Sequence, residues 1–139
     1  MRPGTTLIEV GLAVSILGIM AGFTFPRFAA YRDRIAVDAA TSSTLSMLST
    51  ARHAALRRAG LTAVHLDTAR AIISVVSGID TLERRPLHEV HGVSMSTTRD
   101  SIAFSSSGLG YGAANTRIIL RRGLAADTIA VSRLGRARR

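Results

Sequence analysis

Two hydrophobic patterns follow one another near the N-terminus. From Leu7 to Phe25 the chain reads LIEVGLAVSILGIMAGFTF, in which Glu9 is the one charged residue. A helix of this length just spans the ~30 Å hydrocarbon core of a bilayer, since each residue adds ~1.5 Å. A helix in the core of a soluble domain is amphipathic, whereas this stretch is apolar on every side. The pattern therefore predicts a membrane-spanning helix.

After Pro26 the pattern becomes amphipathic, and it predicts that the same helix continues. Apolar and small residues recur at spacings of three and four, and a polar, mostly uncharged face lies between them. We expect the helix to run from about Thr6 to Arg58, with Gly60 as its C-terminal cap. The expected inner face is Phe28, Tyr31, Ile35, Ala39, Ser42, Leu45 and Leu48, and the expected outer face is Asp38, Thr41, Ser42, Ser43, Ser46 and Ser49.

From Leu61 onward the periodicity changes from helical to extended. Turn residues separate six apolar runs, and one helix followed by about six strands indicates an α+β fold, with the long N-terminal helix packed on an antiparallel sheet. The Gly/Ser-rich segment 105–114 and the Gly78–Asp80 segment are expected as turns or loops. The expected strands are Thr62–Asp67, Arg70–Val76, Leu87–Ser96, Ser101–Ser105, Asn115–Arg121 and Thr128–Arg133.

Composition excludes several kinds of site. The 139 residues contain no cysteine, which excludes disulfides, zinc–thiolate sites and a cysteine nucleophile. Aromatic residues make up 4% and tryptophan is absent, so an aromatic stacking platform for single-stranded nucleic acid is not available. All 18 basic residues are arginine against 9 acidic residues, a net charge of +9. This excess favours partners that carry negative charge.

Residues that could support catalysis do not form a known motif. The Gly108-x-Gly110-x-Gly112 segment lacks the Lys-Ser/Thr of a P-loop, and a strand rather than a helix is expected after it. His88 and His91 are three apart on an expected strand, so they would face opposite sides and make a poor metal pair. The serines at 105–107 have no neighbouring histidine and acid in a recognisable order. We therefore expect no cofactor and no metal site.

The residues around the first hydrophobic segment resemble a known processing signal. Gly4-Thr5-Thr6-Leu7-Ile8-Glu9-Val10 is similar to the class III signal of type IV pilins and pseudopilins. The resemblance implies that a prepilin peptidase cuts between Gly4 and Thr5 and that the new N-terminus is then methylated. Glu9 becomes the fifth mature residue, and Gly18 and Pro26 fall at positions that these pilins commonly fill in the same way.

The resemblance also implies a filament role for Glu9. A carboxylate inside a bilayer or a packed helix bundle is costly unless an opposite charge lies beside it. The N-terminal amine of a neighbouring subunit would supply that charge and would fix the axial register between subunits. The alternative is an acidic residue in the first helical turn that is stabilised by the helix dipole.

The last third of the chain narrows the resemblance. Residues 102–108, IAFSSSG, then Ile118–Leu120, then Ile129–Ser132 with Gly135-Arg136 are similar to the H-type minor pseudopilin of type II secretion and to FimT-type minor pilins. The family pattern is an I-x-F-x-x-x-G stretch, a two-stranded hairpin and a closing G-R. The segment from Leu61 to Arg99 carries no such resemblance.

The C-terminal segment concentrates positive charge. From Asn115 onward there are seven arginines and one acid, Asp127. Arginine suits phosphate because its guanidinium donates two parallel hydrogen bonds. FimT-type pilins that bind DNA for transformation are similar here, since they end in a G-R-x-R element that Gly135–Arg138 matches. The alternative is a solubilising or docking tail that follows the last strand. The candidate DNA-binding residues are Arg133, Arg136, Arg138 and Arg139.

Together these observations predict a non-enzymatic subunit of a filament. Residues 1–4 would be a leader, 5–26 a transmembrane and filament-core helix, 27–60 its amphipathic continuation, and 61–139 a β-rich periplasmic head with a basic tail. The expected partners are the inner membrane, a prepilin peptidase and other pilins or pseudopilins, in type II secretion or a type IV pilus. The alternatives are a DNA receptor at a competence pilus and, more remotely, a signal-anchored periplasmic enzyme. Positive charge follows the apolar stretch at Arg27, Arg32 and Arg34, so charge bias alone would place the head in the cytoplasm. The pilin resemblance implies the opposite orientation, and we follow the resemblance because the charge rule is a statistical bias.

Overall fold

The computed structural model describes residues 6–111 and 115–139, and within the first helix it describes no side chain from 23 to 26. The chain divides into two units, Met1–Arg32 and Asp33–Arg139, which are treated separately below. We call the second unit the head. The elements in chain order are α1 (Leu7–Arg58), β1 (Thr62–Asp67), β2 (Ile72–Ser77), β3 (Asp80–Pro86), α2 (Leu87–His91), β4 (Ser94–Thr97), β5 (Ser101–Phe104), β6 (Gly110–Tyr111), β7 (Thr116–Arg122), β8 (Ala125–Val131) and β9 (Ala137–Arg138).

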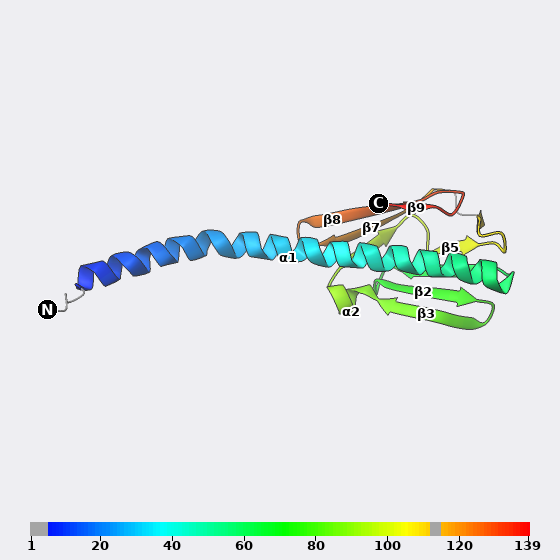
Figure 1. Ribbon diagram of the computed structural model, residues 1–139, viewed down its shortest axis with the longest axis horizontal. Helices are drawn as coiled ribbons and strands as arrows, with labels where there is room; N and C mark the ends of the chain where they lie inside the picture. Colours follow the sequence, from blue (N-terminus) through cyan, green and yellow to red (C-terminus); the bar gives the residue numbers. More distant parts are fainter. Residues whose placement is uncertain (1–5, 112–114) are drawn as a thin grey trace. The chain divides into compact units, whose positions relative to one another are not determined.

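The head is an α+β unit in which the second half of α1 packs on two antiparallel sheets (Figure 1). One sheet has the strand order β3-β2-β1-β5-β6, and the other has the order β4-β7-β8-β9. Alternating residues of both sheets face the helix, as expected for sheets with one buried side. The predicted fold class, a long N-terminal helix on an antiparallel β head, is therefore confirmed.

The buried face of α1 differs from the face predicted. Ala40, Met47 and Ala51 are fully buried, whereas Ile35 and Ser42 are exposed. Small side chains at most of these positions let the helix backbone approach the sheets closely. Leu48 is buried and Leu45 packs against the core, as predicted. The prediction was wrong for Ile35 and Ser42, and also for Thr41 and Ser43, which were assigned to the outer face but are buried. The buried residues of the helix are Val37, Ala40, Thr41, Ser43, Thr44, Met47, Leu48, Ala51, Ala54 and Ala55.

The end of α1 is capped one residue earlier than predicted. Ala59, not Gly60, takes the left-handed conformation, with φ of 49°. The Gly60 N–H donates to the Ala55 carbonyl over 3.2 Å, which is the 6→1 hydrogen bond of a Schellman motif. An alanine therefore occupies the position where glycine is usually found, and some backbone strain follows.

Two strand predictions need correction. The segment predicted as a strand from Leu87 to Ser96 instead forms the short helix α2 and then β4, because Pro86 ends β3 and Gly92, with φ of 65°, ends α2. His88 and His91 therefore lie three apart on a helical turn rather than on opposite faces of a strand. Asp80–Pro86, expected partly as a turn, is strand β3 at a sheet edge.

Candidate functional site

The first turn of α1 contains a capping motif. Thr6 precedes the helix, and its Oγ1 accepts a hydrogen bond from the Glu9 N–H over 3.3 Å. Threonine at the N-cap with glutamate three residues later is the spacing of a capping box. Glu9 is exposed and forms no ion pair within the described part of the chain. No described residue therefore neutralises its charge.

Most of the described apolar side chains in the first half of α1 are exposed within the unit Met1–Arg32. Leu7 is 90% exposed, Leu17 is 65% exposed, and the 18-residue window of highest hydropathy buries none of its residues. By length and composition α1 is long and apolar enough to cross a membrane. Such a surface is stable only in lipid or against other apolar helices.

The predicted processing and assembly residues lie in or beside this half of α1. Gly4 and Thr5 lie outside the described residues, so the cleavage site stays a prediction. Gly18 faces open space, since no atom lies within 4 Å of the point where a β-carbon would stand. Packing within this chain therefore does not require glycine there. The helix backbone continues through Pro26.

Positive charge gathers on the outward face of the four-stranded sheet. In the register of this sheet Arg117 of β7 lies opposite Ala130 of β8, which lies opposite Arg138 of β9. Residues directly opposite one another share a face, so Arg117 and Arg138 are two strand spacings apart, roughly 10 Å. Arg121 shares this outward face of β7. We call Arg117, Arg121, Arg136 and Arg138 the arginine face.

The C-terminal segment is a strand rather than a free tail, and its alternation separates its arginines. Arg136 lies opposite Ser132, whose N–H donates to the Arg136 carbonyl over 2.9 Å. Arg136 and Arg138 are exposed, whereas Ala137 packs against the core. The expectation that the tail follows the last strand was therefore wrong, because β9 pairs with β8. Arg133 is exposed in the turn between these two strands.

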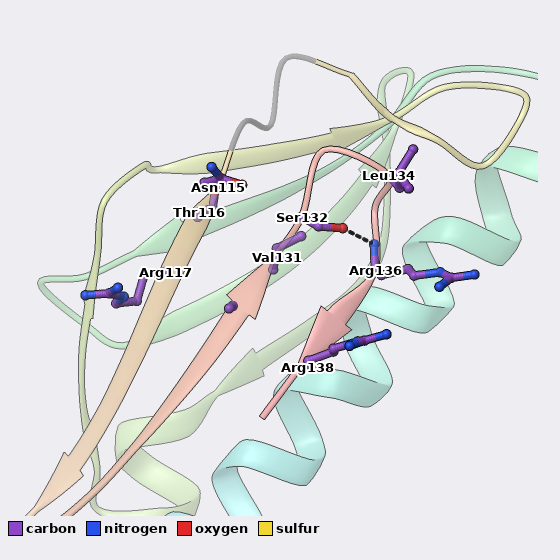
Figure 2. A pocket seen from close by; sticks show the side chains of 9 residues that line it. Asn115, Thr116, Arg117, Val131, Ser132, Leu134, Arg136 and Arg138 are labelled. Atoms are coloured by element: carbon purple, nitrogen blue, oxygen red, sulfur yellow. Dashed lines mark hydrogen bonds between the residues drawn. The ribbon is translucent and has the colours of Figure 1, made fainter.

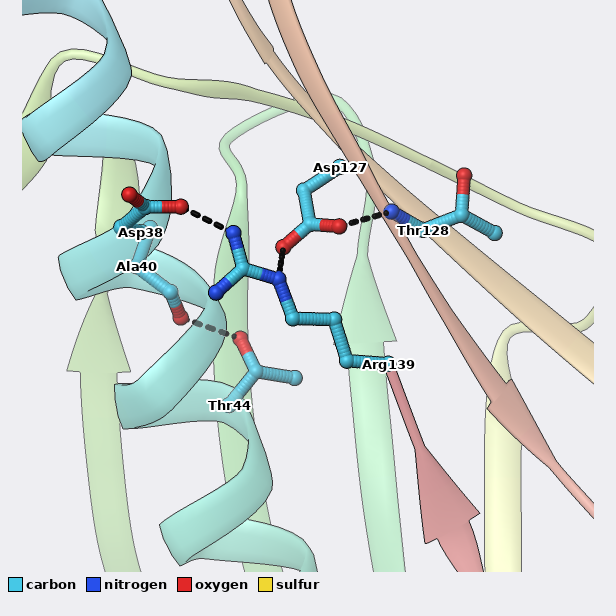
Figure 3. Close-up of polar contacts among 6 residues, drawn as sticks. All are labelled: Asp38, Ala40, Thr44, Asp127, Thr128 and Arg139. Atoms are coloured by element: carbon cyan, nitrogen blue, oxygen red, sulfur yellow. Dashed lines mark hydrogen bonds and ion pairs between the residues drawn. The ribbon is translucent and has the colours of Figure 1, made fainter.

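Arg139 is partly exposed and is held by two carboxylates (Figure 3). Its guanidinium forms ion pairs with Asp38 of α1 and, over 2.6 Å from Nε, with Oδ2 of Asp127 on β8. The Asp127 side chain is only 15% exposed, and its Oδ1 accepts the Thr128 N–H over 2.9 Å. The hydrogen bond to Asp38 raises the pKa of Arg139 above its ordinary value. Arg139 therefore anchors the chain end rather than offering a free charge.

Arg122 is also engaged within the head. Its Nε lies 3.0 Å from Oδ1 of Asp33, and its NH1 donates to the His91 carbonyl. Gly123 follows it with φ of 54°, and a β-carbon at this position would collide with the Asp33 carboxylate. The contact thus joins α1, α2 and the β7–β8 turn, and it removes a second arginine from the set available to ligands.

An open pocket of about 570 Å³ lies on the arginine face. Figure 2 shows Arg117 on one side of it and Arg136 and Arg138 on the other, with β8 between them. Across β4, β7, β8 and β9 the one acid is Asp127, which faces inward. Exposed guanidinium groups without nearby carboxylates suit a phosphate or carboxylate ligand. Among the described residues no group of three His, Cys, Asp or Glu could hold a metal ion.

The sequence predictions and this geometry overlap only in part. Of the candidate DNA-binding residues, Arg136 and Arg138 are exposed, whereas Arg139 pairs with carboxylates of the head. Arg117 joins them only through the strand register, and no local pattern indicates that grouping. The Thr6–Glu9 spacing was readable in the sequence and was missed. Of the predicted Gly108–Gly112 segment, Gly112 lies outside the described residues, and Gly108 takes a left-handed turn conformation with φ of 73°.

Comparison with known proteins gives matches at the level of structure. No protein-family model and no curated protein sequence matches the chain. Two crystal structures of the type IV minor pilin FimU from Pseudomonas aeruginosa strain PAO1, in space groups P21 and P65, are similar to it. The first has a TM-score of 0.64 at 13% identity and covers 78% of this chain and 90% of that chain. The second has a TM-score of 0.60 at 13% identity and covers 73% and 90%.

At this identity the likeness concerns the fold. The first half of the long helix is apolar and exposed, and its second half presents small residues to two antiparallel sheets. This observed topology agrees with the α+β class expected from the sequence. The chain therefore has a type IV pilin-like fold, structurally similar to a minor pilin.

Proposed function

We propose that this protein is a minor pilin or pseudopilin, a structural subunit of a periplasmic filament. The single observation that carries the proposal is the exposed apolar half of α1, whose first turn contains Glu9 and is capped by Thr6, and which continues into a pilin-like head. In the inner membrane lipid covers this half, and in a filament the corresponding helices of other subunits cover it. The head then lies in the periplasm, and Gly4–Thr5 is the site of a prepilin peptidase.

Processing provides the first test. Co-expression with a prepilin peptidase should yield a mature chain that begins at N-methylated Thr5, as measured by intact mass. Gly4→Leu should abolish cleavage, while Gly11→Leu, a matched change at an exposed helix glycine, should leave it intact. Cleavage beyond Phe25 would instead indicate an ordinary secreted protein and would refute the proposal.

Assembly provides the second test. Glu9→Val should leave membrane insertion intact or improve it, because it removes a charge that is costly in the bilayer. The variant should nevertheless be lost from sheared filaments, because the amine of the neighbouring subunit has no carboxylate to pair with. Glu9→Asp, which keeps the charge, should retain part of the assembly. Normal incorporation of Glu9→Val would show that the pairing role is wrong.

The finer assignment, type II secretion or a type IV pilus, concerns the machinery rather than the fold. Neighbouring genes for secretion proteins or for pilus and competence proteins separate these alternatives most quickly. A deletion strain then tests the assignment, since loss of exported proteins indicates secretion and loss of surface filaments indicates a pilus.

A second function, DNA binding of the FimT type, is favoured by the arginine face. Arg117, Arg136 and Arg138 point outward around one pocket without a carboxylate on the same sheet face. With Arg133 they could engage about four phosphates, which gives a slope of roughly −3.6 in log K against log salt. The full chain in detergent micelles should then bind duplex DNA without sequence preference.

Matched variants test this binding by fluorescence anisotropy across a salt series. Arg136→Ala with Arg138→Ala should weaken binding and reduce the magnitude of the slope by about 2. Arg70→Ala with Arg84→Ala, which removes two exposed charges from the other sheet, should change the slope far less. Arg139→Ala should leave the slope nearly unchanged, because Asp38 and Asp127 already neutralise that charge. Binding by the Arg136/Arg138 variant equal to that of the parent would exclude this function for the arginine face.

A further inference from the structure

The end of the head formed by the C-terminus of α1 and the nearby turns exposes apolar side chains. We define this tip surface by Leu56, Leu61, Ile79, Leu109 and Leu134. Ile79 is 101% exposed, and the other four are 46–59% exposed. Each belongs to a different segment: the last turn of α1, the start of β1, the β2–β3 turn, the β5–β6 turn and the β8–β9 turn (Figure 1).

Contacts and strand register place these segments side by side. Thr62 of β1 lies opposite Ser77 of β2 and Phe104 of β5, so the preceding residue, Leu61, lies between the two following turns. The Leu56 side chain lies about 3.1 Å from the point where a Gly108 β-carbon would stand. A β-carbon at Gly110 would stand 2.9 Å from the Arg133 carbonyl oxygen. The five apolar residues therefore form a single surface that crosses both sheets.

Exposed apolar residues are otherwise rare on the described part of the head. The remaining large ones are Ile35, Val90, Tyr111 and Leu124. Tyr111 is on β6, next to the tip. Ile35, Val90 and Leu124 flank the Asp33–Arg122–His91 contact and so mark the opposite end. An apolar surface gathered at one end, with polar sheet faces beside it, is typical of a protein-binding site.

Charge decides what kind of chain fits the tip. In the described residues Arg57 and Arg133 border the surface without ion pairs, and Asp80, the nearby acid, already pairs with Arg58 over 3.3 Å. If two copies met tip to tip, Arg57 and Arg133 of one copy would face the same arginines of the other. Stacking of the tip on the opposite end would bring them toward mixed charge rather than a carboxylate border. The exposed charged residues at that end are Arg34, Arg70 and Arg121 with Asp67, Glu89 and Asp100. Like charges that face one another across an interface weaken binding.

We propose that the tip surface binds a protein chain different from this one, whose contact face is apolar and bordered by carboxylates. The five apolar side chains would supply the desolvated centre, and Arg57 and Arg133 would supply the charged border. The proposal goes beyond filament membership, because it names a face of the head and the chemistry of its partner, and it holds for either type of filament.

Photo-crosslinking in cells that express the full chain tests the proposal. A p-benzoylphenylalanine in place of Ile79 should form an adduct with a heterologous chain, and mass spectrometry should place the crosslink in an acidic segment of that chain. The same photo-reactive residue in place of Leu124 is the matched control, because Leu124 is also 101% exposed in a turn but lies at the opposite end. It should not form this adduct.

Charge reversal distinguishes a specific interface from mere exposure. Arg57→Glu with Arg133→Glu should reduce the adduct yield from position 79 about tenfold, because the carboxylates of the partner would now face carboxylates. Both arginines are exposed, so the circular dichroism spectrum should stay unchanged. An adduct between two differently tagged copies of this chain would overturn the proposal. So would the absence of an adduct, an equal yield from position 124, or a yield that charge reversal does not change.

Discussion

The two halves of α1 use the same backbone geometry with opposite consequences for their apolar side chains. In the first half Leu17 is 65% exposed, whereas in the second half Leu48 is 3% exposed. The first half carries apolar residues on every side, and its most apolar 18-residue window buries none of its residues. The second half carries a stripe of alanine, threonine and methionine, which the two sheets cover. Burial within the chain therefore follows the width of the apolar face rather than the total hydrophobicity.

The acidic residues of the two halves differ in the same way. Glu9 has no ion pair among the described residues, whereas Asp33 pairs with Arg122 and Asp38 pairs with Arg139. In the second half the carboxylates hold strands and turns onto the helix. In the first half the carboxylate has no such structural role among the described residues. Acidic residues thus stabilise the fold in the second half, and the proposed role of Glu9 in assembly belongs to the first half.

The strongest test of this comparison is the same substitution in each half. Leu48→Ala should destabilise the head by about 2–5 kcal/mol, because it removes buried methyl groups and leaves a cavity. Leu17→Ala should change the stability of the head by less than about 0.5 kcal/mol. Denaturant unfolding of the full chain in detergent micelles measures both. Equal destabilisation would show that the first half contributes to the core of the head.

Removal of one acid from each half sharpens the comparison. Asp33→Ala should cost about 1.5–3 kcal/mol of unfolding free energy, because it leaves the partly buried Arg122 without its charged partner. Glu9→Val should leave the stability of the head unchanged, although it impairs assembly. Gly123→Ala tests the same contact from the other side and should also lower the unfolding free energy, since its β-carbon would displace the Asp33 carboxylate. If Asp33→Ala is neutral in denaturant unfolding, the contact between α1 and the β7–β8 turn does not stabilise the head.

The smallest expected effect concerns the end of the second half. Ala59→Gly should stabilise the head by about 0.5–1 kcal/mol, because it relieves the left-handed conformation of a residue that carries a β-carbon. Ala36→Gly, the same substitution within the helix, should destabilise by about 1 kcal/mol. Melting temperatures that move in opposite directions would confirm the cap. A fall in both would mean that the Ala59 conformation carries no strain.

Local periodicity in the sequence predicted part of this structure correctly. The predicted helix from about Thr6 to Arg58 matches Leu7–Arg58, and β1 was predicted with its observed bounds. Both depend on residues near in sequence, through the 3.6-residue and two-residue repeats. The buried face of α1 was predicted only in part, because Leu48 is buried as expected but Ala40 and Ala51 are buried by the closeness of the sheets rather than by their own hydrophobicity.

By itself the sequence determined the apolar segment, the change from helix to strands and the concentration of arginine after Asn115. The tertiary structure decided which of those arginines are available to a ligand. Arg117 lies beside Arg138 through the register of β7, β8 and β9, and the outward position of Arg138 leaves the next residue, Arg139, facing Asp38 and Asp127. A shift of one residue in that register would exchange the two faces, so the division between binding charge and structural charge exists only once distant strands have paired.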